Sequence, residues 1–285
     1  MRSWLVGYLL LILSLAPARA GEVRLVAEGG RQLLADFRPG RADAPALLIL
    51  HGFLVTASFP AIQALASEFS GKGYTVLAPT LSLGISGRRA GLGCDAIHMH
   101  AHDDDLAEVA RWVDWLAGRV QGPIVLVGHS FGGAQALAYI ARAPNPRVAA
   151  MVGVSLSYVG ARGEEVWPDE LARAEAFRAS GKRDLGRFHL IYCHGNYVAP
   201  AGSYLSYASL TRERVLALSA QARAPVVAIM GGEDQRFGAD WVEAMRRAGI
   251  TVRQVPGASH FFDGSHEFDL LDAVDSALRD LRITP

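Results

Sequence analysis

A serine flanked by glycines is the most distinctive chemical feature of the sequence. Residues 128–132 read GHSFG and lie between an apolar run of strand character, 124–127, and a stretch of helical character. The pattern G-x-S-x-G between a strand and a helix is typical of a sharp turn that presents a nucleophilic serine. A serine hydroxyl needs a neighbouring base before it attacks at neutral pH. We therefore predict that Ser130 is a nucleophile and that its base lies elsewhere in the chain.

An acid and a base follow Ser130 in the order that this chemistry requires. Asp234 comes soon after the apolar run 226–230, and His260 comes soon after the strand-like run 252–255. The carboxyl ends of parallel strands meet at one edge of a sheet, where open α/β folds build their sites. We predict that His260 is the general base and that Asp234 orients its imidazole ring.

Neighbouring residues leave alternatives for both roles. Glu233 and Asp263 could replace Asp234 as the acid. His266 could replace His260 as the base, although it lies at the start of the last predicted helix.

The elements that must position these residues follow an alternating pattern. Short apolar runs of strand length alternate with amphipathic stretches of helical period. The predicted strands are 23–26, 32–37, 46–50, 74–78, 124–127, 148–154, 226–230 and 252–255. The predicted helices are 61–69, 103–120, 134–143, 240–248 and 267–281. This alternation predicts an α/β fold with a mostly parallel, doubly wound sheet and helices on both faces.

The alternation stops between residues 158 and 222, which have little strand character and many aromatic side chains. We predict an inserted, mainly helical cap over 157–223, which divides the core into 21–156 and 224–285. The aromatic side chains could line an apolar or aromatic acyl pocket, or they could form the core of the cap itself. They are Trp167, Phe177, Phe188, Tyr192, Tyr197, Tyr204 and Tyr207.

In motif, order and spacing the chain resembles the α/β-hydrolase superfamily, from the hairpin predicted for strands 23–26 and 32–37 to the last helix. The resemblance implies an oxyanion hole made by the backbone N–H groups of Phe131 and Phe53, because Phe53 closely follows the apolar strand 46–50. It also implies a serine esterase or lipase-like activity that needs no cofactor, in which an acyl group passes to Ser130 and then to water. A serine at the elbow argues against reactions on haloalkanes and epoxides. The expected partner is a small-molecule acyl substrate.

Three histidines at alternate positions, His98, His100 and His102, precede the long helix. If the segment is extended all three share a face, whereas in a helix only His98 and His102 do, so spacing alone does not define a metal site. We predict a polar helix entrance or a wall of the active-site mouth, with no metal, and keep metal binding as the alternative. Arg88 and Arg89 could meet an anionic substrate, but we predict a solvated loop there.

Residues 1–20 have the features of a cleavable signal peptide. Arg2 precedes the apolar run 4–16, and Ala18 and Ala20 form an Ala-x-Ala cleavage pattern. The run is shorter than the roughly 20 residues that cross a bilayer as a helix. We predict cleavage after Ala20, export to the periplasm or secretion, and no stable membrane span afterwards. An uncleaved N-terminal anchor is the alternative.

Export changes the interpretation of the only two cysteines, Cys94 and Cys193. In an oxidising compartment the two thiols could form a disulfide. Alternatively, they could be two small buried apolar side chains.

Composition excludes several classes of protein and leaves one rival function. The 28 basic and 28 acidic side chains cancel, and no basic stripe offers a surface for a phosphate backbone, so we predict no nucleic-acid partner. A rival interpretation is a binding or assembly protein of the cell envelope that kept the fold and lost the reaction. The presence of all three candidate catalytic residues argues against it. The sequence does not indicate the oligomeric state.

Overall fold

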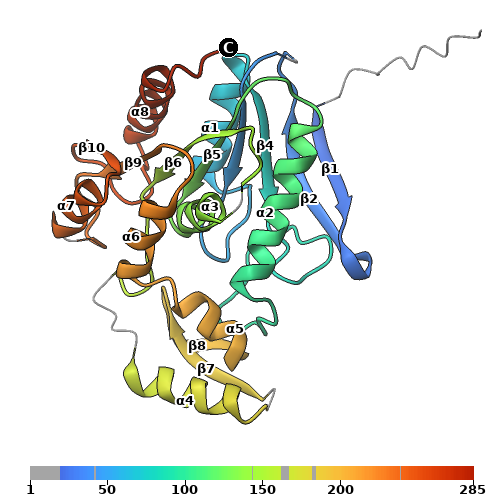
Figure 1. The fold of residues 1–285 in the computed structure, drawn as a ribbon, viewed down its shortest axis with the longest axis vertical. Coiled ribbons are helices and arrows are strands. Elements are labelled where there is room, and N and C mark those ends of the chain that lie inside the picture. The colour runs from blue at the N-terminus through green and yellow to red at the C-terminus, as the bar shows by residue number, and fades with distance from the viewer. Residues whose placement is uncertain (1–19, 42, 143, 162–166, 182–183, 238) are drawn as a thin grey trace, which may run out of the picture.

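A mostly parallel sheet forms the centre of the molecule (Figure 1). The computed structural model describes residues 20–41, 43–142, 144–161, 167–181, 184–237 and 239–285. The sheet has eight strands in the order β1-β2-β4-β3-β5-β6-β9-β10. Its strands are β1 (Gly21–Val26), β2 (Gln32–Arg38), β3 (Ala46–Leu50), β4 (Thr75–Thr80), β5 (Ile124–His129), β6 (Val148–Val154), β9 (Val226–Gly231) and β10 (Thr251–Val255).

Pairing is antiparallel only at one side of this sheet. β2 runs antiparallel to both β1 and β4, and the remaining neighbours pair in parallel. The central strands β3, β5 and β9 are buried along their whole length, which explains why their sequences are almost continuously apolar. The structure confirms the predicted fold class.

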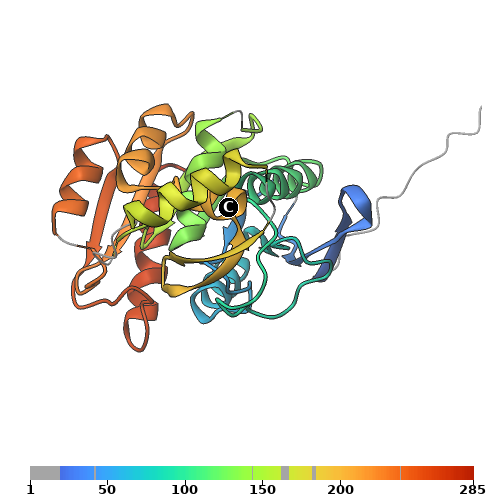
Figure 2. The same cartoon turned by 90° about the horizontal axis from the view of Figure 1, so that it is seen from below.

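Helices cover both faces of the sheet, as Figures 1 and 2 show. α1 and α8 pack on one face, and α2, α3 and α7 pack on the other. The helices outside the region between β6 and β9 are α1 (Pro60–Gly71), α2 (His102–Ala117), α3 (Phe131–Ala141), α7 (Ala239–Arg247) and α8 (His266–Asp280), and a short 3-10 turn, η1, spans Glu28–Gly30.

The long helix α2 illustrates how the sequence pattern becomes packing. Its buried residues Leu106, Val109 and Val113 recur at steps of three and four, which places them on one face against the sheet. Acidic residues occupy its first turn, where the helix dipole favours negative charge.

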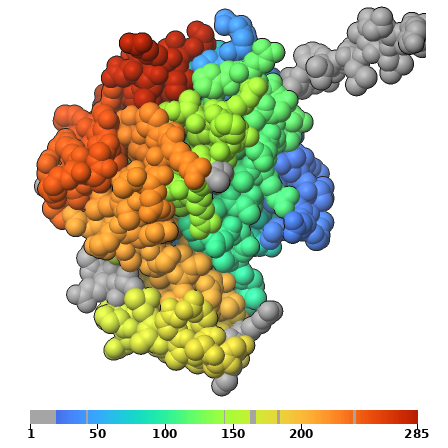
Figure 3. Space-filling model, in the orientation of Figure 1, coloured from blue at the N-terminus to red at the C-terminus, as the bar shows by residue number. Residues whose placement is uncertain are grey.

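Between β6 and β9 the chain leaves the sheet and forms a separate layer. It contains α4 (Pro168–Ala179), β7 (Leu185–Leu190), β8 (Cys193–Pro200), α5 (Ala201–Ala208) and α6 (Arg212–Gln221). α4 and α5 pack on each other, α5 also packs on the hairpin, and α6 packs against α3. Figure 3 shows the yellow and light-orange surface of α4, the hairpin and α5 at the lower end of the molecule, with the orange surface of α6 above it.

The β7–β8 hairpin was not predicted, and the expectation of little strand character in this region is wrong. Both strands are only half-buried, and Leu185 is exposed while the interior of β8 includes Gly195 and Asn196. Such strands give a weak periodic signal in the sequence. The boundaries 157–223 for a cap stay a prediction.

The predicted signal peptide lies almost entirely outside the described residues, which begin at Ala20. β1 begins at Gly21, directly after the predicted cleavage point. In the part of the chain that the structure describes, no helix combines the length and the apolar character needed to span a membrane.

Candidate active site

Ser130 lies on a sharp turn between β5 and α3. Its φ angle is 56°, in the left-handed region that a serine rarely adopts, and α3 begins at the next residue. A Cβ on Gly128 would lie 2.5 Å from the Gly132 carbonyl oxygen, and one on Gly132 would lie 2.4 Å from the His51 carbonyl oxygen. The two glycines therefore allow a turn too tight for any other residue. The helix starts three residues earlier than predicted, because it continues directly from the elbow.

The structure brings Ser130, His260 and Asp234 into one chain of hydrogen bonds. His260 Nε2 lies 3.0 Å from Ser130 Oγ, and His260 Nδ1 lies 2.7 Å from Asp234 Oδ2. The side chains of His260 and Asp234 are only 4% and 2% exposed. A carboxylate can only accept a hydrogen bond, so Asp234 favours the tautomer with hydrogen on Nδ1. In that tautomer Nε2 carries a lone pair and can accept a hydrogen bond from the Ser130 hydroxyl.

The alternative acids and base lie elsewhere. Glu233 and Asp263 are exposed, and the Asp263 carboxylate accepts a hydrogen bond from the Ser259 hydroxyl. His266, at the start of α8, contacts Asp269 at 2.8 Å. None of these contacts reaches Ser130.

Two further residues hold the backbone of His260, and the sequence analysis did not identify this role. The Ser155 hydroxyl donates to the His260 carbonyl oxygen at 2.8 Å, and His129 Nε2 lies 3.2 Å from the same oxygen. Burial lowers the pKa of His129 to about 3, so its ring is neutral near pH 7. The ring stacks on Phe59. The only feature of the sequence that could have indicated a role for Ser155 at the site is its position directly after β6.

The two predicted oxyanion donors come from neighbouring segments. Phe131 is the first residue of α3, and the first N–H groups of an α-helix have no acceptor within the helix. Phe53 lies in the loop after β3, and its ring is 5.7 Å from that of Phe131. A Cβ on Gly52 would lie 3.4 Å from the Ser130 Cβ, so this loop lies directly against the elbow.

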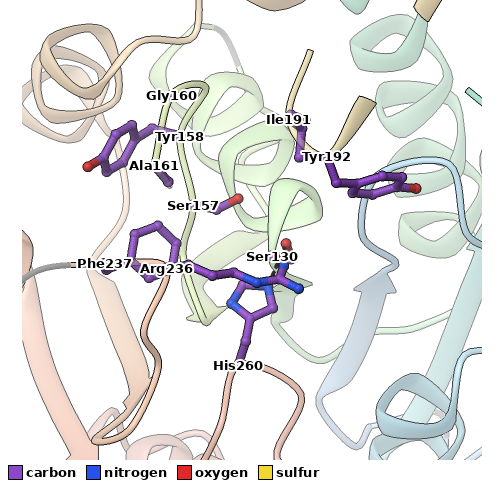
Figure 4. A pocket seen from close by; sticks show the side chains of 10 residues that line it. All are labelled: Ser130, Ser157, Tyr158, Gly160, Ala161, Ile191, Tyr192, Arg236, Phe237 and His260. Carbon is purple, nitrogen blue, oxygen red and sulfur yellow. Dashed lines mark hydrogen bonds between the residues drawn. The ribbon is translucent and has the colours of Figure 1, made fainter. Parts of the chain in front are cut away.

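A small pocket of about 30 Å³ opens above Ser130 and His260 (Figure 4). Three segments surround it: the loop after β6, the loop after β9, and the turn between β7 and β8. Their lining residues are Ser157, Tyr158, Gly160, Ala161, Ile191, Tyr192, Arg236 and Phe237. The sequence analysis named only Tyr192 among these, because pocket walls drawn from three distant loops have no common sequence pattern.

A model of the alpha/beta hydrolase family matches residues 47–273, which is most of the chain. The chain belongs to the alpha/beta hydrolase family. The match includes the elbow, Asp234 and His260, so the resemblance inferred from the sequence is confirmed. A search of curated proteins finds no match.

Several solved structures have the same overall fold. Est1E from Butyrivibrio proteoclasticus is 16% identical, with a TM-score of 0.66 over 92% of this chain and 99% of that one. The alpha/beta hydrolase GrgF from Penicillium sp. sh18 is 18% identical, with a TM-score of 0.68 over 93% and 100% of the two chains. The esterase PF2001 from Pyrococcus furiosus is 15% identical, with a TM-score of 0.63 over 92% and 91%.

The three alternate histidines of this hydrolase are buried in its interior. His98 stacks on Tyr197, with ring centroids 4.3 Å apart, while His100 and His102 contact the ring of Tyr207. Burial lowers the pKa of His100 to about 3 and that of His102 to about 4. Among the described residues, no three potential ligands gather around a point where a metal could bind.

The two candidate arginines, Arg88 and Arg89, have different environments. Arg88 is buried, and its guanidinium donates to the carbonyl oxygens of Leu81 at 2.6 Å and Val55 at 2.8 Å. Arg89 pairs with Glu22 at the surface. The prediction of a solvated loop is therefore wrong for Arg88, because its donors replace water as partners of backbone carbonyls.

A disulfide joins Cys94 and Cys193, whose Cα atoms are 5.5 Å apart. It connects the segment before α2 to the start of β8.

Most of the aromatic side chains between β6 and β9 form core rather than pocket. Phe188 and Tyr204 are buried and stack with ring centroids 4.1 Å apart. Tyr207 is also buried, and its hydroxyl donates to the Asp105 carboxylate of α2, which links this layer to the main core. Tyr158 and Tyr192 line the pocket instead, and Trp167 is exposed.

Proposed function

We propose that this alpha/beta hydrolase cleaves a carboxylic ester, or a related acyl bond, through an acyl-enzyme on Ser130. The observation that carries the proposal is the continuous hydrogen-bond chain from Asp234 through His260 to Ser130. A buried acid, an imidazole and a hydroxyl in this order are the arrangement that activates a serine.

In the proposed first step, Ser130 Oγ attacks the carbonyl carbon and His260 Nε2 takes its proton. The Nδ1–H bond to Asp234 stabilises the resulting imidazolium. The N–H groups of Phe53 and Phe131 stabilise the negative charge that develops on the carbonyl oxygen. His260 then donates its proton to the leaving alcohol, and the acyl group stays on Ser130.

In the second step, His260 Nε2 removes a proton from water, which attacks the acyl carbon. The same two N–H groups stabilise the second tetrahedral intermediate. His260 returns the proton to Ser130 Oγ, the acid leaves, and the enzyme is restored without a cofactor.

The apolar side chains around the pocket support a substrate with an apolar or aromatic part. Its walls include the side chains of Tyr158, Ile191 and Phe237. A solved structure of Est1E, 17% identical, contains ferulic acid. We therefore propose esters of small carboxylic acids as the substrate class.

The proposal is tested by treating the protein with a fluorophosphonate and measuring its intact mass. We expect one covalent adduct on the wild type and none on Ser130→Ala. Ser157→Ala removes another hydroxyl that lines the same pocket, and we expect it still to take one adduct. Ester hydrolysis is measured on the same samples with a series of acyl chain lengths.

Two results would contradict the acyl-enzyme proposal. An adduct or residual turnover in Ser130→Ala would show that another group is the nucleophile. A folded wild-type protein that takes no adduct and cleaves no ester would favour the binding or assembly role instead.

We also propose that the protein is exported and acts in the periplasm or outside the cell. The Cys94–Cys193 disulfide supports this, because disulfides persist in oxidising compartments. Expression of the full chain in a Gram-negative host tests it. We expect a periplasmic product whose N-terminal residue is Gly21, and a cytoplasmic product that retains residues 1–20 would contradict export.

A further inference from the structure

The loop that carries Phe53 has a strained backbone. Leu54 has a φ angle of 57°, and Val55 N donates to the Phe53 carbonyl oxygen at 2.8 Å, so the chain turns within three residues. A hydrogen bond between residues two apart around a positive φ is characteristic of a rare and strained γ-turn. Such a conformation persists only where the surroundings stabilise it. The loop therefore depends on contacts from outside itself.

Those contacts reach each of the three carbonyl oxygens in the turn. The Tyr192 hydroxyl donates to Phe53 O at 2.9 Å, and the Leu92 backbone N–H donates to Leu54 O at 2.9 Å. Arg88 Nη2 donates to the carbonyl oxygen of Val55 at 2.8 Å. Two separate segments thus hold the turn: residues 88–92, and the turn between β7 and β8 that carries Tyr192.

The disulfide connects these two segments. Cys94 lies two residues after Leu92, and Cys193 directly follows Tyr192. Close by, the backbone N–H of Val198 donates to the carbonyl oxygen of Cys94 at 3.3 Å. The two segments that contact the turn are therefore covalently linked to each other.

We propose that Tyr192 is a positioning residue for the oxyanion site: its hydroxyl holds the Phe53 carbonyl, and the Cys94–Cys193 disulfide holds Tyr192 in place. The inference rests on the proposed function, because it requires negative charge to develop on an oxygen beside Ser130. The Phe53 carbonyl and N–H belong to adjacent peptide units, so fixing one limits the direction of the other.

The environment of Tyr192 suits a positioning role rather than a catalytic one. Its ring extends away from Ser130 (Figure 4), and its hydroxyl contacts the loop backbone. Burial raises the pKa of Tyr192 to about 12, so the hydroxyl keeps its proton and donates throughout the working pH range.

Tyr192→Phe removes the hydroxyl and keeps the ring, whose centroid lies 5.5 Å from that of the Phe53 ring in an edge-to-face arrangement. Tyr197→Phe is a matched control. The Tyr197 ring lies 5.9 Å from the same Phe53 ring, but within the described residues its buried hydroxyl has no hydrogen-bond partner.

The test is steady-state ester hydrolysis, with active sites counted by fluorophosphonate titration. We expect kcat of Tyr192→Phe to fall by about 5- to 50-fold, a fraction of the loss caused by deleting an oxyanion donor. We expect KM to change by less than about twofold, and the inhibition constant of a trifluoromethyl ketone to rise by the same factor as kcat/KM falls. Tyr197→Phe should retain the kcat and inhibition constant of the wild type. A purely structural role would lower the titrated fraction or the Tm without changing kcat per titrated site, and that result would overturn the proposal.

The contribution of the disulfide is tested with the double variant Cys94→Ser, Cys193→Ser. We expect a loss of kcat similar to that of Tyr192→Phe and little further loss when the two changes are combined, because both act through the same hydrogen bond. Fully additive losses would overturn the part of the proposal that concerns the disulfide.

The outcomes also separate this inference from the proposed function. If the wild type is labelled and Tyr192→Phe retains full kcat, the positioning role is wrong and the acyl-enzyme proposal stands. If the folded wild type is not labelled and cleaves no ester, both are overturned.

Discussion

Nδ1 of His260 lies 2.7 Å from Oδ2 of Asp234, and both side chains are almost completely buried. The loops after β9 and β10 bring the two residues together at the carboxyl edge of the sheet. A backbone group holds the carboxylate as well, since Arg236 N donates to the other oxygen, Oδ1, at 3.1 Å. The acid is therefore fixed in a position from which it can select one tautomer of His260.

Replacing Asp234 by Asn should lower kcat for ester hydrolysis by about 10³- to 10⁴-fold, because an amide can no longer require the Nδ1–H tautomer. KM should change little, since Asp234 does not line the pocket. Asp263→Asn is the control and should leave kcat unchanged. Steady-state kinetics on both variants check this, and equal losses in the two would contradict the assignment of the acid.

Replacing Gly132 by Ala should disrupt the elbow and the loop after β3 together. The new Cβ would lie 2.4 Å from the His51 carbonyl oxygen and 2.8 Å from that of Leu50, and neither backbone group can yield easily. We expect a loss of about 1–3 kcal/mol in the free energy of unfolding, and a fall in kcat of about 100-fold through misplacement of the reacting groups.

Gly202→Ala is the matched control for this change, because a Cβ there meets nothing within 4 Å. Urea denaturation and ester kinetics measure both effects. Wild-type kcat in Gly132→Ala would mean that the elbow and the loop after β3 tolerate displacement.

Arg88 and Arg89 are adjacent in sequence but should differ sharply in their effect on stability. Arg88→Met removes the donors of several buried carbonyl oxygens, including those of Leu81 and Val55. We expect it to cost about 2–4 kcal/mol in the free energy of unfolding. Arg89→Met loses only an exposed ion pair with Glu22, and we expect no measurable change. Similar urea midpoints for the two variants would contradict the structural role of Arg88.

Stability should fall on acidification because several histidines are buried in the neutral form. Burial lowers the pKa values of His51, His100 and His129 to about 3 and that of His102 to about 4. The stabilisation that comes from these neutral rings is fully present above the pKa of histidine in the unfolded chain, about 6.5. It is lost as the pH falls from there towards the pKa values in the folded protein. Between these pKa values, each histidine adds up to about 1.4 kcal/mol per pH unit to the slope of the free energy of unfolding against pH.

Buried carboxyl groups oppose this trend in part. Burial raises the pKa values of Asp105 and Glu108, so their ionised forms destabilise the fold at neutral pH and protonation relieves that cost. Urea unfolding between pH 7.5 and 4.5 measures the net slope. His100→Leu should reduce the slope by the amount of one histidine, because it removes a ring whose pKa burial lowers to about 3. An unchanged slope in His100→Leu would contradict the burial of a neutral ring.

The sequence by itself determined the features that depend on short-range rules. The steric demand for glycine on both sides of Ser130 identifies the elbow from five residues. Runs of buried apolar residues and helical periodicity identify the sheet strands and the core helices, since each pattern reflects burial of its own element. Asp234 and His260 could be found because residues directly after parallel strands collect at one edge of the sheet.

Only the tertiary structure decided which distant groups meet. Tyr192 and Phe53 are 139 residues apart, and their hydrogen bond exists only because the β7–β8 turn lies over the loop after β3. The burial of Arg88 and the neutral state of His100 likewise follow from what packs around them. Contacts between distant segments depend on complementary shape and on the exclusion of water between those segments. The local sequence of one segment determines neither property.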